Sequence, residues 1–200
     1  MARAIRRFSQ AIERAENLLN FAENLQDENI RKDNIRMAIV LAISGMDGYF
    51  TSKFRDIITP YLYNNEPGDD LIKLLENAGL NTRTALELIW MDRPLRRIGT
   101  LIERHFDRYT TQRFEAIDEL FKAIGLQKLS ENAERKIGRK TLRSSVSRLV
   151  TKRHQIVHDA DINSHAKQRS VNLDETRRRI KDVKLFVMAC DEILENRISN

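Results

Sequence analysis

The chain is organised around the stretch Arg148–Ile162, which reads RLVTKRHQIVHDADI. Its aliphatic positions, which a helix can bury, are Leu149, Val150, Ile156 and Val157. Arg153, His154 and His158 lie among them, and a helix that only faced solvent would not need imidazoles packed between arginine and valine. The stretch therefore predicts a helix that a core holds in place and that carries a polar site.

The side chains of Arg153, His154 and His158 indicate proton transfer at a phosphate. Histidine, whose unperturbed pKa is about 6.5, exchanges protons near neutral pH. The planar guanidinium of arginine donates two parallel hydrogen bonds to a phosphate. The three residues are therefore the candidate catalytic residues.

Composition and periodicity predict an all-α protein. The chain has 200 residues, of which 41% are hydrophobic, and only seven are glycine and three are proline. Apolar residues recur every three or four positions, which is the repeat of an amphipathic helix. We expect the core helices near residues 2–26, 33–60, 139–158 and 173–198, with Asp33 as the N-terminal cap of the second.

Shorter helices are expected in the middle of the chain. The clearest loop is NNEPGDD, residues 64–70. The expected helices that follow it lie near residues 71–78, 81–91, 94–109 and 114–124. We therefore expect a single domain over residues 1–200, in which residues 64–130 form a helical insertion or subdomain between two halves of one bundle.

The positive charge of the chain is concentrated just before the two histidines. The net charge is +6, and no acidic residue occurs from Arg135 to His158. The cations of this block that we expect to bind RNA or another phosphate are Arg139, Lys140, Arg143, Arg148 and Lys152. Such a block fits an anionic partner, with nucleic acid first, although a solvated helix face is the alternative interpretation.

Two glycines, Gly45 and Gly48, interrupt the second core helix, and Asp47 lies between them. Each glycine inside a helix costs roughly 1 kcal/mol relative to alanine. Close approach of another backbone would offset that cost, so we expect a second helix to pack tightly here.

Cysteine use and hydropathy indicate a soluble, cytoplasmic protein. The single cysteine, Cys190, excludes an intramolecular disulfide and a cysteine-based zinc cluster. The N-terminus has no apolar region of the kind that secretory signals contain, and the longest apolar run, Met37–Met46, is too short to cross a bilayer. The apolar stripe of the last helix, from Ile180 to Leu194, fits either a core face or a dimer interface.

The spacing of Arg153 and His158, with four residues between them, resembles the signature of the HEPN superfamily (higher eukaryotes and prokaryotes nucleotide-binding domains). His154 takes the polar position after the arginine. The sequence RHQIVHD, followed by a long apolar helix, is similar to the corresponding motif of the RiboL-PSP-HEPN branch. The segment SGMDGYF at residues 44–50, with Phe54, is similar to the first core helix of that branch. This resemblance covers roughly residues 30–60 and 140–198.

The resemblance implies a HEPN-like helical bundle that cleaves RNA without a metal or other cofactor, through attack of the ribose 2′-OH. It further implies a homodimer whose two Arg/His motifs face each other. His158 would then be the acid/base, Arg153 would bind the phosphate, and His154 would orient it or carry a second proton. Asp47 would support Arg153. A toxin or phage-defence role, with an antitoxin or defence-system partner, is the expected setting.

Two other interpretations stay open. Some HEPN relatives are non-catalytic modules that bind nucleic acid or nucleotides, or that dimerise. A metal enzyme is the other alternative, because His154 and His158 are four residues apart and His165, Asp159 or Asp161 would add a third ligand. Gln155 stands where zinc proteases have their glutamate, and the neighbouring cations oppose a divalent ion.

Overall fold

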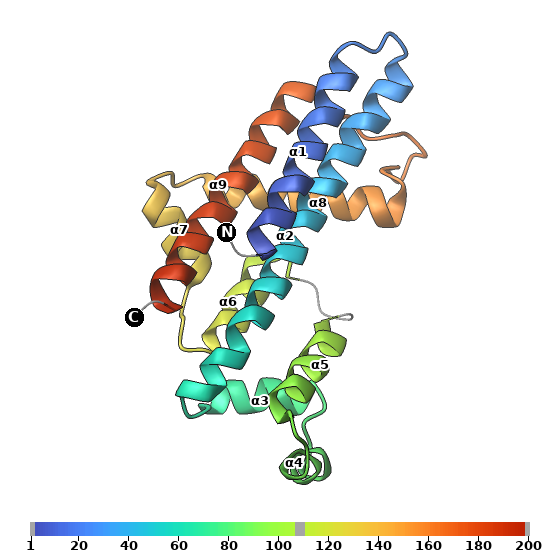
Figure 1. Ribbon diagram of the computed structural model, residues 1–200. Coiled ribbons are helices and arrows are strands. Elements are labelled where there is room, and N and C mark those ends of the chain that lie inside the picture. Colours follow the sequence, from blue (N-terminus) through green and yellow to red (C-terminus); the bar gives the residue numbers. More distant parts are fainter. Residues whose placement is uncertain (1–2, 107–110, 199–200) are drawn as a thin grey trace. The chain divides into compact units, whose positions relative to one another are not determined.

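The computed structural model describes residues 3–106 and 111–198, and their regular structure is helical (Figure 1). The helices are α1 (Arg3–Glu23), α2 (Glu28–Asn64), α3 (Asp69–Asn77), α4 (Thr82–Ile89), α5 (Pro94–Phe106), α6 (Phe114–Lys122), α7 (Leu129–Ile137), α8 (Leu142–Asp159) and α9 (Leu173–Ile198). In these residues extended pairing is limited to one isolated bridge between Ile162 and Gln168. The prediction of an all-α protein is confirmed.

The helices group into two compact units. The first contains residues 1–49 and 130–200, and the second contains residues 50–129. The long helix α2 begins in the first unit and ends in the second. The inserted subdomain that we expect over residues 64–130 lies almost wholly within the second unit.

The core of the first unit is built by amphipathic helices. In α1 the positions spaced by three and four residues are buried, among them Ile5, Phe8 and Ile12. Helix α9 packs against both α1 and α8. The stripe of α9 from Ile180 to Leu194 is fully buried inside the unit. This stripe is therefore a core face, and its alternative interpretation as a dimer interface is wrong.

Several predicted helix boundaries are corrected by the structure. The cap of α2 is Asp27, whose Oδ1 accepts hydrogen bonds from the backbone N–H groups of Asn29 and Ile30 at 2.9 and 3.1 Å. Asp33, the predicted cap, lies inside the helix and pairs with Arg36 at 3.3 Å. The earlier cap gives a longer helix, because it satisfies the free N–H groups one turn before Asp33.

The other helix ends differ from the prediction by a few residues. Helix α2 continues through Pro60 to Asn64, and α8 begins at Leu142 rather than at 139. The predicted limits at Ala2 and at Tyr109 fall outside the described residues. None of the described helices is long and apolar enough to span a membrane.

The second unit has an aromatic core around Phe121 of α6. The rings of Phe50 and Phe54 on α2 meet Phe121 edge-on, with centroid distances of 6.1 and 5.7 Å. Such edge-to-face pairs stabilise a core beyond the area that they bury. Helices α3 and α4 pack on α5. This unit therefore has a core of its own.

Gly45 lies at a close approach between α1 and α2. A Cβ atom at Gly45 would lie 2.6 Å from the Cβ of Ala11 on α1, whereas a Cβ at Gly48 would meet nothing within 4 Å. The predicted close approach is therefore confirmed for Gly45 and wrong for Gly48.

We expect Gly45→Ala to lower the free energy of unfolding by roughly 1–2 kcal/mol, because overpacking outweighs the gain in helix propensity. Gly48→Ala in the same helix is the matched control and should raise it by about 0.5–1 kcal/mol. Urea unfolding followed by circular dichroism measures both. Equal changes in the two variants would contradict the close approach at Gly45.

Candidate functional site

The Arg153–His158 motif occupies the last two turns of α8. This helix buries Leu142, Val146 and Leu149. It ends at Ala160, which adopts the left-handed conformation with φ 50°. The core therefore fixes the first half of α8, and the exposed second half carries the motif.

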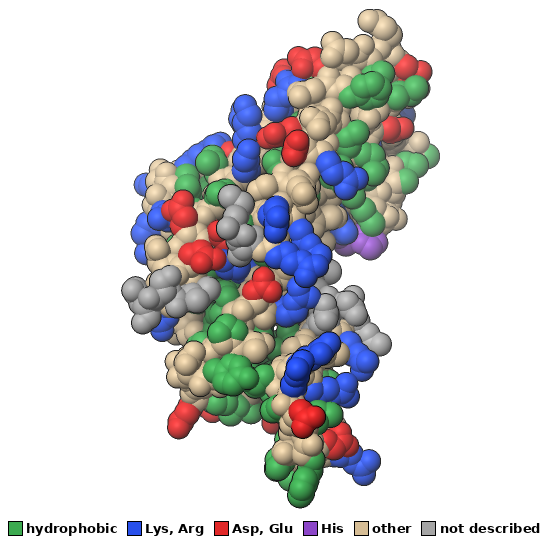
Figure 2. Space-filling model, viewed as in Figure 1, with side chains coloured by type: hydrophobic (Ala, Val, Ile, Leu, Met, Phe, Trp, Pro, Cys, Tyr) green, Lys and Arg blue, Asp and Glu red, His purple; other side chains and the backbone are tan. Residues whose placement is uncertain are grey.

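His154 and His158 lie side by side on the exposed face of α8. Their ring centroids are 4.3 Å apart, and the rings are tilted by 40°. Both side chains are exposed. The histidine side chains visible in Figure 2 form one patch, which borders hydrophobic side chains. A spacing of four residues thus brings two imidazoles together at the surface.

Arg153 faces a different direction from the histidine pair. It is half-buried, and its Nε atom is buried without a hydrogen-bond partner among the described residues. Five positions on a helix differ by about 140°, since each turn takes 3.6 residues. Arg153 forms no ion pair with Asp47 or with any other described residue. One chain therefore brings the two histidines together but does not join Arg153 to them.

The chain segment after the motif is held by a buried carboxylate. Asp161 is 0% exposed, and it accepts hydrogen bonds from Nε of Arg36 at 2.8 Å and from Nζ of Lys152 at 2.7 Å. The two cations also donate to the backbone carbonyls of Arg169 and Ser170, at 2.7 and 3.1 Å. This network, the Asp161 triad (Asp161, Arg36 and Lys152), ties α2, α8 and the following loop together.

The sequence contains a signal for this triad that our sequence analysis missed. Arg36 stands three residues before Ile39 and seven before Ile43, so it lies on the apolar face of α2. A cation on a buried face needs a buried acid as its partner. Asp161 was considered only as a metal ligand.

Four of the five predicted phosphate-binding cations fall into two groups. Lys152 is paired with Asp161, and Arg139 donates through both Nη atoms to the buried carboxylate of Asp182. These two side chains stabilise the fold. Lys140 and Arg148 are exposed and form no ion pair with the described residues. The remaining predicted residue, Arg143, is half-buried, and its backbone N–H donates to Glu134 at 3.0 Å.

Arg148 lies in a basic pocket at the start of α8 and α9. This pocket, which we call the arginine groove, has a volume of about 290 Å³. Its lining residues are Arg139, Thr141, Ser144, Ser145, Arg148, Arg178 and Arg179. Asp182 and Glu175 pair with Arg139 and Arg179, whereas Arg148 and Arg178 form no ion pair with the described residues. A second pocket of about 590 Å³ shares Arg148 and Arg179 with the groove.

Arg178 and Arg179 were missed because the sequence analysis followed the charge block only as far as Arg153. The run of arginines at residues 177–179 was the available signal. Its proximity to Arg148 depends on how α8 packs on α9, which no local pattern shows.

The residues around the histidine pair do not fit a metal ion. Asp161 is already neutralised by two cations, and Asp159 lies 3.9 Å from Arg169. No group of three or more His, Cys, Asp or Glu side chains suited to a metal occurs in the part of the chain that the structure describes. The third ligand that the metal interpretation requires is therefore missing from those residues.

Comparison with family models gives a match to RiboL-PSP-HEPN over residues 7–196. The chain belongs to this family. The match covers residues 64–130 as well, which corrects the narrower extent of the resemblance that the motifs alone supported. No curated protein and no solved structure matches the chain. The HEPN family includes ribonucleases and nucleotide-binding members.

The Asp161 triad gives a prediction for stability. Asp161→Ala should lower the free energy of unfolding by roughly 3–5 kcal/mol, because it leaves Lys152 without its counter-charge and leaves the buried Arg36 with only the exposed Asp33 as a partner. Hydrogen exchange should show faster exchange of backbone amides in residues 160–171.

The matched control is Asp159→Ala two residues away, at an exposed position. Its effect should stay within about 0.5 kcal/mol, as for most surface substitutions. A similar loss of stability in both variants would show that the triad does not hold this segment.

Proposed function

We propose that this HEPN protein is a metal-independent endoribonuclease, in which Arg153 and His158 of two copies form each active site. The observation that carries the proposal is the pair of exposed imidazoles, with ring centroids 4.3 Å apart, on the helix that also carries Arg153. Family membership adds support, because HEPN domains are often ribonucleases.

The proposed reaction needs only groups that this site contains. A neutral imidazole removes the proton from the ribose 2′-OH, and the 2′-oxygen forms a bond to phosphorus. The bond from phosphorus to the 5′-oxygen breaks, and an imidazolium donates its proton to that leaving oxygen. The products are a 2′,3′-cyclic phosphate and a 5′-hydroxyl. Arg153 stabilises the charge on the equatorial phosphate oxygens.

The direction of attack favours a site made by two copies. The entering and leaving oxygens lie on opposite sides of phosphorus, so the base and the acid must approach from opposite sides. His154 and His158 of one chain are adjacent on one helix face and reach only one side. A second copy related by a two-fold axis would supply the opposite side and a second Arg153.

The exposed apolar side chains beside His158 are suited to such an interface. Val157 is 47% exposed and Ile162 is 44% exposed. Leu149 of the same helix and the apolar stripe of α9 are buried in the core, so they are not available for this contact. We therefore place the proposed dimer contact around Val157 and Ile162.

The arginine groove would hold the RNA backbone away from the point of cleavage. Arg148 and Arg178 have no acidic partner among the described residues, and the hydroxyl group of Thr141 lines the same pocket, whereas those of Ser144 and Ser145 donate to Thr141 and Asp182. Phosphate oxygens bind well to arginine forks and hydroxyls. We assign RNA binding to these residues, with a toxin or phage-defence role and a cognate antitoxin or defence-system protein as the biological setting.

A non-catalytic nucleic-acid-binding or dimerisation module is the second candidate. The observation that favours it is the orientation of Arg153, whose Nε is buried and which does not meet the histidines of its own chain. Such a module would bind RNA through the arginine groove without cleaving it.

The first test replaces single histidines. We expect His158→Ala to lower the rate of RNA cleavage by about 10²- to 10⁴-fold, the usual contribution of a general acid or base. The melting temperature should not change, because the side chain is exposed. His165→Ala is the control, since this histidine is also exposed but lies in the loop. Unchanged cleavage by His158→Ala protein would remove this residue from the mechanism.

The second test concerns assembly. Sedimentation should show a dimer at micromolar concentration, and RNA should strengthen it by relieving repulsion between the facing arginines. Val157→Glu should give a folded monomer whose cleavage rate falls at least about tenfold. Phe21→Glu, at another exposed apolar position, should remain dimeric and active. A monomeric variant that still cleaves RNA at the full rate would refute the shared site.

A further inference from the structure

The second unit exposes an unusual apolar segment at α4. None of the residues of this helix is buried, and Leu86 and Ile89 are 58% and 72% exposed. Trp90, which directly follows, is 89% exposed. It is the single tryptophan of the chain. A large aromatic ring held in solvent at the end of a helix is the kind of feature that marks a binding surface.

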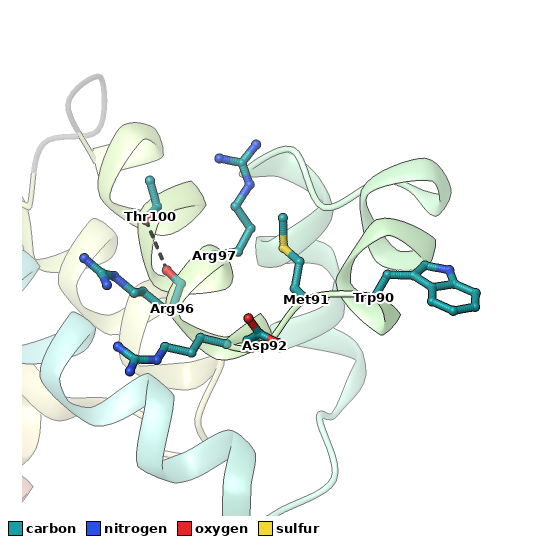
Figure 3. Close-up of a pocket in the computed structure, with 7 residues that line it drawn as sticks. Trp90, Met91, Asp92, Arg96, Arg97 and Thr100 are labelled. Carbon is teal, nitrogen blue, oxygen red and sulfur yellow. Dashed lines mark hydrogen bonds between the residues drawn. The ribbon is translucent and has the colours of Figure 1, made fainter.

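Three arginines accompany Trp90. A pocket of about 700 Å³ is lined by Trp90, Met91, Asp92, Arg93, Arg96, Arg97 and Thr100 (Figure 3). The side chains of the three arginines form no ion pair with any residue that the structure describes. Asp92 is the single acidic residue in this lining. The surface is therefore strongly basic beside an exposed indole.

We propose that Trp90, Arg93, Arg96 and Arg97, here called the Trp90 surface, bind an extended single strand of nucleic acid. The indole stacks on a base, and the arginines bind backbone phosphates. Proteins that hold single strands without sequence preference combine these two elements, aromatic platforms and positive grooves. Through this surface the second unit would hold the RNA that the proposed ribonuclease cleaves. The inference rests on the proposed function only in taking RNA as the natural strand.

The directions of the side chains require an extended ligand. Figure 3 shows the indole of Trp90 and the guanidinium of Arg96 pointing in opposite directions. A mononucleotide carries only one base and one phosphate group. A strand of several nucleotides can place a base on the indole and its following phosphates over the arginines.

Charge decides between nucleic acid and a protein partner. The pocket lining contains three arginines and one aspartate. The regularly spaced phosphates of a nucleic-acid strand can pair with all three arginines. The exposed Leu86 and Ile89 would suit a protein, but a protein would need acidic groups opposite each arginine. We therefore assign the surface to a single strand, and docking of a protein becomes an outcome of the test.

The test uses the fluorescence of Trp90. Because the chain has no other tryptophan, any quenching of indole emission reports on this one side chain. The probe is a 12-nucleotide oligodeoxythymidine, which lacks the 2′-OH and cannot be cleaved by the proposed reaction. We expect saturable quenching by this strand, little quenching by an abasic strand of equal length, and none by thymidine monophosphate.

Variants separate the two elements of the surface. By anisotropy of a labelled strand, Trp90→Ala should raise the Kd about 5- to 100-fold, the range for loss of one stacked base. Combined Arg96→Ala and Arg97→Ala should raise it about tenfold or more and lower its salt dependence. Arg83→Ala is the control, because Arg83 is exposed on α4, the helix that Trp90 follows, but does not line the pocket.

Either of two results would overturn the proposal. One is unchanged emission at saturating strand concentrations, which is also expected if the surface docks a protein instead. The other is a Trp90→Ala protein that binds the strand as tightly as the unmodified chain. The titration should also be repeated with His158→Ala protein. Strand binding that persists in this variant shows that failure of the proposed ribonuclease function and failure of the Trp90 surface are distinguishable.

Discussion

The buried carboxylate of Asp161 is the interaction on which the proposed site depends. It joins Arg36 of α2 to Lys152 of α8, and the same cations bind the carbonyls of Arg169 and Ser170. Burying charges is costly unless each is paired and hydrogen-bonded, and this network meets that condition. Because Asp161 follows α8 directly, the triad fixes where the helix ends and how its last two turns face solvent.

This constraint also divides the cations by role. Lys152 and Arg139 pair with carboxylates that are almost fully buried, so these two cations stabilise the fold. Arg148 and Arg178 have no acidic partner among residues 3–106 and 111–198, and they line a pocket with three hydroxyl groups. The net charge of +6 therefore says less about RNA binding than the positions of the few arginines that remain unpaired.

The sequence predicted the parts of the molecule that depend on local periodicity. Apolar spacing identified α9 at its observed bounds and the buried stripe of α1, and the close approach at Gly45 followed from helix propensity. The histidine pair followed from a spacing of four. The Asp161 triad did not, because Arg36 lies 125 residues from Asp161 along the chain. The arginine groove likewise depends on how α8 packs against α9, which is a tertiary contact.

In the proposed reaction the nucleophile that attacks the scissile phosphate is the ribose 2′-oxygen and not water. The identity of the nucleophile determines the chemical groups at the ends of the RNA fragments. The most direct measurement is mass spectrometry of fragments made by the pure protein in excess EDTA. The account predicts 2′,3′-cyclic phosphate ends, some opened to 3′-phosphate, with 5′-hydroxyl ends on the partner fragments. Fragments with 5′-phosphate and 3′-hydroxyl ends, formed only when a divalent metal is present, would contradict it.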